Sequence, residues 1–178
     1  AARRQPRARV RGGHGVGVTT GSGAITVSAP INDNSGAVTL VQSGSGTLTL
    51  SGTNNFSGGT VLNSGTLTTT TPNTNLGAGT VSVNGPVTWN FGTTGSSRAL
   101  TINDGAYLSM SGTSNQSFSG VLSGNGTINQ TGSIGINFSN SSNTFTGPIN
   151  IAYALSFASL GDSTNPINIG GATNWAWT

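Results

Sequence analysis

The chain has 178 residues, among which are six arginines, three aspartates and no cysteine. Without cysteine it cannot be a disulfide-stabilised module. Five of the six arginines lie in the first eleven residues, so the rest of the chain lacks the basic patch that nucleic-acid binding requires. More than half of the residues are Gly, Ser, Thr or Asn, but the low charge and the regular spacing of the apolar residues favour a repetitive β structure over disorder.

Residues 1–20 differ in composition from the remainder. Arginine and alanine dominate the first eleven residues, and no apolar run follows them as it would in a signal peptide. We predict that this segment is a disordered or artefactual basic leader; the alternative is a basic arm that contacts an anionic surface. His14 lies in this segment without a partner, so neither a catalytic nor a metal-binding role is expected for it.

From Ala24 onward, short apolar runs alternate with separators of Gly, Asn and Ser, a pattern typical of strands and turns. No window shows the period of a helix. The predicted strands are Ala24–Ser28, Ala37–Gln42, Gly46–Ser51, Thr60–Leu62, Thr66–Thr70, Thr80–Val83, Val87–Phe91, Ala99–Asn103, Ala106–Ser111, Gly126–Gln130, Ile134–Ser139, Ile149–Tyr153, Ala154–Phe157 and Ile167–Ile169.

The stretch from Gly44 to Leu67 shows the pattern most clearly. In Thr47–Leu50 hydroxyl and apolar side chains alternate, as they do in a half-buried strand. Glycine and asparagine in the separators tolerate positive φ and therefore form turns. Strands this short cannot bury enough surface alone, so we expect them to stack on neighbouring coils of a solenoid.

Parts of this stretch occur again further along the chain. Gln42–Ser45 corresponds to Gln130–Ser133 at an offset of 88 residues, and Asn54–Gly58 corresponds to Asn143–Gly147 at an offset of 89. We predict two diverged repeats, at about 31–91 and 119–177, within one β-helical segment that spans residues 24–178.

The first copy resembles the passenger-associated transport repeat, also called the autotransporter-associated β-strand repeat. The residues that carry the resemblance are Gly44, Gly46, Leu48, Leu50, Gly52, Asn54, Phe56, Gly58, Gly59, Gly65 and Leu67. The second copy departs from the pattern, because Pro148 replaces the second glycine after Phe-x-Gly. The resemblance implies an all-β, right-handed parallel β-helix from the passenger of a bacterial type V autotransporter, exported to the cell surface or the medium by a C-terminal β-barrel translocator.

A coil of about three strands predicts four to five coils, cut from a longer solenoid. Inward positions are expected to take Val, Ile, Leu and Phe, and outward positions Thr, Ser and Asn. Together with the resemblance, this architecture indicates a stalk or spacer that supports secretion and folding. Its expected partners are neighbouring coils and the translocator.

The sequence offers no catalytic site and no cofactor motif. Asp33, Asp104 and Asp162 each lie in a turn, where aspartate caps its own backbone. Stacking could bring two of them together, as a polysaccharide-degrading β-helix enzyme requires, but no nucleophile–base pair accompanies them, and we expect no enzyme activity. The Thr-x-Thr runs in 47–49 and 66–70 do not recur at a fixed period, which argues against an ice-binding face.

Two aromatic pairs have the spacing of side chains on one face of a strand: Trp89 with Phe91, and Trp175 with Trp177. Facing inward, they fill a wide core, which is the preferred interpretation. Facing outward, they form a stacking platform for sugar rings or a contact patch. The outward alternative would make the chain an adhesin that binds host or matrix glycans.

Overall fold

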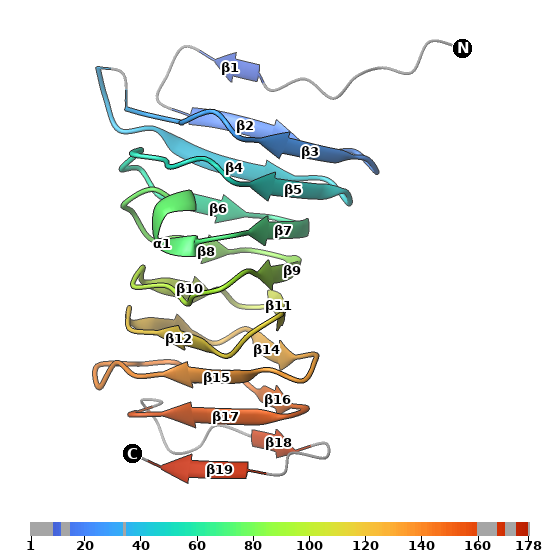
Figure 1. The fold of residues 1–178 in the computed structure, drawn as a ribbon, viewed down its shortest axis with the longest axis vertical. Helices are drawn as coiled ribbons and strands as arrows, with labels where there is room; N and C mark the ends of the chain where they lie inside the picture. Colours follow the sequence, from blue (N-terminus) through green and yellow to red (C-terminus); the bar gives the residue numbers. More distant parts are fainter. Residues whose placement is uncertain (1–8, 12–14, 34, 160–166, 170–173, 178) are drawn as a thin grey trace.

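The computed structural model describes residues 9–11, 15–33, 35–159, 167–169 and 174–177. They form an all-β solenoid of about seven turns, in which short strands stack along one axis (Figure 1). The prediction of a parallel β-helix is therefore confirmed. Among the described residues the one helix is α1 (Pro72–Asn75), a single turn that begins at a proline.

Sheet A forms the first side of the solenoid. Its strands follow one another in the order β1 (Arg9–Arg11), β2 (Gly15–Thr19), β4 (Thr39–Ser43), β6 (Thr60–Leu62), β8 (Val81–Val83), β10 (Leu100–Ile102) and β13 (Leu122–Gly124). Strand β1 is antiparallel to β2, whereas the other neighbours in this sheet are parallel.

Sheets B and C form the other two sides, with parallel pairing throughout the described strands. Sheet B contains β3 (Ala24–Val27), β5 (Thr47–Leu50), β7 (Gly65–Thr69), β9 (Pro86–Phe91), β11 (Tyr107–Gly112), β14 (Thr127–Gln130), β16 (Ile149–Ile151) and β18 (Ile167–Ile169). Sheet C contains β12 (Gln116–Phe118), β15 (Gly135–Phe138), β17 (Ala154–Phe157) and β19 (Asn174–Trp177). The ladders thus shift from sheets A and B at the start of the solenoid to sheets B and C at its end.

The number of coils differs from the prediction of four to five. Register partners in adjacent coils are between 18 residues apart, as for Ile149 and Ile167, and 24 residues apart, as for Gly15 and Thr39. Most coils have strands on only two sides, because segments such as 51–59 run along the third side without forming a ladder. Fewer strands in each coil give more coils for the same number of strands.

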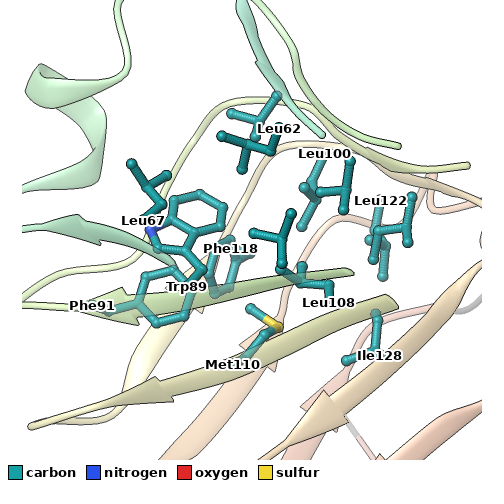
Figure 2. Packing of buried hydrophobic residues seen from close by; sticks show 14 of the residues in the cluster. Leu62, Leu67, Trp89, Phe91, Leu100, Leu108, Met110, Phe118, Leu122 and Ile128 are labelled. Carbon is teal, nitrogen blue, oxygen red and sulfur yellow. The ribbon is translucent and has the colours of Figure 1, made fainter. Parts of the chain in front are cut away.

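The core is a stack of inward side chains from consecutive coils. Leu48, Leu67, Trp89 and Met110 are register partners in that order, and each is at most 1% exposed. Figure 2 shows the middle of this stack, where Phe91 lies beside Trp89 among leucines. Each coil therefore buries its apolar side chains mainly against the coils on either side, which is how a solenoid is stabilised.

The leader prediction is wrong for residues 15–19. They form β2, which pairs in parallel with β4 over five residues, and Val18 is buried. The segment Gly-Val-Gly-Val-Thr has the period of a strand, but its glycines remove two of the side chains from which the alternation is read. Residues 9–11 also form a strand, β1, whereas His14 lies outside the described residues.

Each of the fourteen strands predicted from Ala24 onward corresponds to a strand of the structure, within a few residues at its ends. Strands β12, β13 and β19 were not predicted from the sequence. In β12 the inward positions are Gln116 and Phe118, so one of the two buried residues is polar and the apolar alternation is incomplete.

Candidate functional site

The repeat motif of residues 44–67 lies in adjacent coils near the start of the solenoid. Its apolar residues Leu48, Leu50, Phe56 and Leu67 point into the core and are 0% exposed. The threonines between the leucines lie on the outer face, as the two-residue period of a strand requires. The apolar half of the motif is therefore a core element.

Gly59 shows why the motif needs glycine at its turns. Its φ is +86°, a left-handed conformation that costs other residues about 1–2 kcal/mol. A Cβ atom there would lie 2.6 Å from the carbonyl oxygen of Thr80 in the next coil. The other motif glycines share one or both constraints: positive φ at Gly44 and Gly65, and close approach of a neighbouring coil at Gly46, Gly52 and Gly58.

Asn54 joins three consecutive coils at one corner of the core. It is 5% exposed, its Oδ1 accepts a hydrogen bond from the backbone N–H of Ile31 (2.7 Å), and its Nδ2 donates to the carbonyl oxygen of Asn75 (2.5 Å). Ile31 lies one coil before Asn54 and Asn75 one coil after it. The side chain therefore satisfies two backbone groups at a corner where the ladder of backbone hydrogen bonds is interrupted.

Asn143 has the same role in the second copy. Its Oδ1 accepts a hydrogen bond from the N–H of Leu122 (2.8 Å), and its Nδ2 donates to the carbonyl oxygen of Ser159 (2.9 Å). Gln42 and Gln130 form a second matched pair, since the Nε2 of each donates to a carbonyl oxygen 24 residues later. Residues that correspond in the sequence thus make equivalent hydrogen bonds in the structure.

The two copies nevertheless occupy different sides of the solenoid. Gln42 lies on β4 in sheet A, whereas Gln130 lies on β14 in sheet B. The residue that stacks above Gln42 four coils later, counted through the register partners in sheet A, is Gly124. Gly124 precedes Gln130 by six residues. An offset of 88 residues therefore equals four coils plus one side, and the second copy is rotated about the axis by one of the three sides.

Trp89 and Phe91 lie in the core, as the preferred interpretation expected. They are 1% and 3% exposed, and their ring centroids are 4.6 Å apart. Phe118 packs edge-on against both rings, and Trp89 Nε1 donates a hydrogen bond to the buried hydroxyl of Thr69 (2.9 Å). This pair is therefore not an exposed platform for sugar rings, because its faces are covered by other core side chains.

Asp33 and Asp104 lie in different coils, and each accepts a hydrogen bond from the next coil. Oδ1 of Asp33 accepts from the backbone N–H of Val38 (2.7 Å) and of Ser57 (3.1 Å). The hydroxyl of Ser57, followed by these two N–H groups, lowers the pKa of Asp33. Asp104 accepts a longer hydrogen bond from Nδ2 of Asn125 (3.3 Å). Asp33 thus caps a backbone N–H of its own loop and one of the next coil, whereas the hydrogen bond of Asp104 is to a side chain of the next coil rather than to its own backbone.

Several of the residues singled out in the sequence lie outside the described part. Asp162 is one of them, and the side chains of Trp175 and Trp177 are others, although their backbone forms β19. Within the described ranges, no group of three His, Cys, Asp or Glu side chains could hold a metal ion. No helical segment there has the length and hydrophobicity needed to span a bilayer.

The outer face of sheet B carries two rows of hydroxyl and amide side chains, in which neighbours are register partners. The first row is Thr47, Thr66, Thr88, Ser109 and Asn129, and the second row is Thr26, Thr49, Thr68, Asn90 and Ser111. Side chains repeat about every 4.8 Å along the axis, and the rows are about 6.7 Å apart. Threonine pairs therefore do stack; coils of unequal length hide this register in the sequence.

A groove of about 410 Å³ lies at the end of the second row. Three consecutive coils line it, with three successive residues each: 68–70, 90–92 and 111–113. The row residues of these coils bring hydroxyl and amide groups to the groove, whereas the ring of Phe91 is packed in the core and is 3% exposed. At Gly92 and Gly112 a Cβ atom would meet the preceding coil, at Thr70 and Phe91 respectively, so these glycines allow the three coils to approach closely beside the groove.

A separate ladder of asparagines follows the corner between sheets A and B. Asn84 donates from Nδ2 to Oδ1 of Asn63 (3.1 Å), and Asn103 donates to Oδ1 of Asn84 (2.5 Å). Asn84 and Asn103 are exposed, so water can replace these hydrogen bonds. This ladder lines up adjacent coils but satisfies no buried group, in contrast to Asn54.

Two comparisons with known proteins agree with this architecture. A family model described as passenger-associated-transport-repeat matches residues 40–69, which comprise β4 to β7. The chain is also 44% identical over 62 residues to a protein named Adhesin BmaC autotransporter from Brucella suis biovar 1 (strain 1330), and this match covers 34% of the chain and 2% of that protein. No solved structure is significantly similar to the chain. Residues 40–69 therefore carry one passenger-associated transport repeat within a parallel β-solenoid, and the chain is similar over about a third of its length to an autotransporter.

Proposed function

We propose that this chain is a structural part of an autotransporter passenger, a stalk or spacer that also supports export and folding at the cell surface. The observation that carries this proposal is the continuous stacking of short coils, each held by the ladders and core side chains of its two neighbours. A passenger of this kind acts by its length and stiffness and needs no catalytic group. Its partners would be neighbouring coils and a C-terminal translocator.

Support for a role in export comes from how such a solenoid folds. The backbone of one coil hydrogen-bonds to the next, and corner amides such as that of Asn54 reach across three coils. Contacts are therefore between nearest neighbours, and folding can propagate along the axis. A chain that emerges unfolded would gain free energy with each coil that it adds outside the cell, which favours outward movement. The absence of cysteine prevents premature crosslinks on the way.

An in-register deletion tests this function in the full-length protein. Thr60 and Val81 are register partners, so deletion of residues 60–80 removes one whole coil and joins equivalent positions. Deletion of residues 60–69 removes about half a coil and is the matched control. We expect an epitope placed before the solenoid to reach the cell surface in the first variant and to be retained or degraded in the second. Protease treatment of intact cells measures this.

Two outcomes would contradict the stalk function. Equal surface display of both variants would mean that coil register does not matter for export. Loss of display in both, although the in-register variant folds when purified, would mean that the missing coil has a specific role beyond length.

Adhesion is a second candidate function. The similar protein of Brucella suis is named an adhesin, and the two rows on sheet B give this chain an uncharged outer surface of hydroxyl and amide groups. Beads coated with the chain should then adhere to cultured host cells or to extracellular matrix more strongly than beads coated with serum albumin. Equal adhesion of the two kinds of bead would remove this candidate.

A further inference from the structure

The groove beside the two rows of sheet B has the properties of a saccharide site. We propose that it holds one sugar residue of a neutral polysaccharide, whose chain continues along the rows. This inference rests on the adhesive function and names its site and ligand; it does not depend on the stalk function. It also differs from an aromatic platform, because both rings of the pair Trp89 and Phe91 are buried.

Charge favours a neutral ligand. None of the nine residues that line the groove is charged, and neither row contains a charged side chain. The guanidinium of Arg98 is committed elsewhere, since it donates to the carbonyl oxygens of Asn73 (2.8 Å) and Ala78 (3.4 Å). A phosphate, a sulfate or a uronic acid would therefore find no cation to pair with, whereas a neutral sugar needs none.

The hydrogen-bonding capacity of the rows is largely unused. Four threonines of the rows lie on β5 and β7: Thr47, Thr49, Thr66 and Thr68. Among the described residues, no hydrogen-bond partner is found for their side-chain hydroxyls. On sheet A, in contrast, the hydroxyl of Thr101 is bonded to that of Ser123 (2.9 Å). A hydroxyl both donates and accepts hydrogen bonds, as the hydroxyls of a sugar do, so the two surfaces are complementary in either direction.

The groove also has the size and the mixed polarity of a ligand site. Its volume of about 410 Å³ lies within the range of about 300–1,000 Å³ for small-molecule pockets. Thr68, Asn90 and Ser111 provide polar groups on consecutive coils, and Ser111 already donates a hydrogen bond to Oδ1 of Asn90. Much of the remaining lining is apolar and suits the C–H face of a sugar ring, although the ring of Phe91 itself is packed in the core.

The rows explain why the ligand should be a polymer. Each coil presents the same kind of side chain at the same position, so a chain of like units that lies along the axis meets like groups repeatedly. Single contacts with exposed hydroxyls are weak, but several along one chain add up, as in multivalent binding. A free monosaccharide would occupy the groove alone and gain none of these further contacts.

Affinity electrophoresis of the full chain through gels that contain a polysaccharide tests the proposal. The gels contain a neutral glucan, a galactomannan, a xylan or, for comparison, an acidic pectin. The groove variant combines Thr68→Val with Ser111→Ala, which removes two hydroxyls at the groove. The control variant combines Thr101→Val with Ser82→Ala, which removes two hydroxyls on sheet A that lie neither at the groove nor in either row. Circular dichroism and the midpoint of urea unfolding show that both variants remain folded.

We expect retardation of the wild-type chain by at least one neutral polysaccharide, a loss of affinity of tenfold or more in the groove variant, and little change in the control. Equal binding by both variants would place the site elsewhere. Retardation by pectin alone, or by no polysaccharide, would overturn the proposal. Slowed growth of ice crystals in the presence of the chain, without binding to any polysaccharide, would also overturn it. Binding to gels without adhesion of coated beads to cells would leave the site in place and remove only the host-cell role.

Discussion

The corner amide of Asn54 offers the sharpest test of how the coils are held together. Replacing it by alanine removes one acceptor and one donor but leaves the backbone of the motif unchanged. The N–H of Ile31 and the carbonyl oxygen of Asn75 then lose their partners in two different coils. The inward neighbours of Asn54 in the motif, Gly52 and Phe56, have no polar side chain, and the nearby amide of Asn75 is already bonded to the carbonyl oxygen of Gly52.

The size of the effect follows from the burial of these two groups. A buried backbone group that loses its hydrogen bond costs about 1–3 kcal/mol. Ile31 is only partly buried, so its N–H contributes toward the lower end of this range, whereas Asn75 is 1% exposed. We expect Asn54→Ala to reduce the free energy of unfolding by about 2–5 kcal/mol. With an m value of about 2–3 kcal/mol/M, the midpoint in urea falls by about 0.7–2.5 M.

Urea unfolding followed by circular dichroism measures this loss, and amide hydrogen exchange at Ile31 gives a local readout. Asn84→Ala is the matched control, because it deletes the same atoms from an exposed asparagine whose hydrogen bonds water can replace. Its effect should stay within about 0.5 kcal/mol. Asn143→Ala should behave like Asn54→Ala, since Asn143 makes the equivalent hydrogen bonds.

Equal shifts for the Asn54 and Asn84 variants would refute this reasoning, because they would show that burial of the bonded groups does not set the cost. A loss of less than about 1 kcal/mol in Asn54→Ala would do the same. It would mean that water or a backbone shift satisfies both groups when the amide is absent.

Three further predictions concern single residues. Gly59→Ala should lose about 1–2 kcal/mol of stability because of its left-handed φ, and a further amount because the carbonyl of Thr80 must move. Gly105→Ala should lose only the amount due to φ, since its φ is +70° and no atom lies within 4 Å of its Cβ position. Urea unfolding compares the two variants. Trp89→Ala should lose about 3–5 kcal/mol in the same assay, with Trp89→Phe recovering much of it, because the ring fills the core. Hydrogen bonds hold the pKa of Asp33 below its ordinary value of 3.8. Its charge therefore stabilises the fold at neutral pH, and this stabilisation is lost as the pH falls through the lowered pKa. Asp33→Asn should be less stable than wild type at neutral pH, and urea unfolding should show this difference shrinking as the pH falls below the ordinary value.

The sequence predicted the strands well because their signal is local. The alternation of leucine and threonine in Thr47–Leu50 follows from backbone geometry alone, whatever lies above or below the strand. Strand β2 was missed because glycine hides the same alternation. The number of coils could not be read in this way, since it depends on whether the third side of each coil forms a ladder, and that is decided by hydrogen bonds between segments about 20 residues apart.

The groove was not visible in the sequence for a related reason. The stacking of residues 68, 90 and 111 depends on two coil lengths that differ by one residue, 22 and then 21. A search for a fixed period passes over such a set. The inward placement of Trp89, in contrast, was favoured from its spacing relative to Phe91, because two large rings on one face of a strand are more stable when they are buried together.

The rotation of the second copy by one side has a consequence for an array of such repeats. If further copies followed at the same offset, three of them would point in three directions and the fourth would point the same way as the first. Equivalent surfaces would then wind around the rod like the steps of a spiral staircase. A solenoid built in this way would present the same surface in three directions around its axis. Whatever its rotation about that axis on the cell, some copy would face the neighbouring surface.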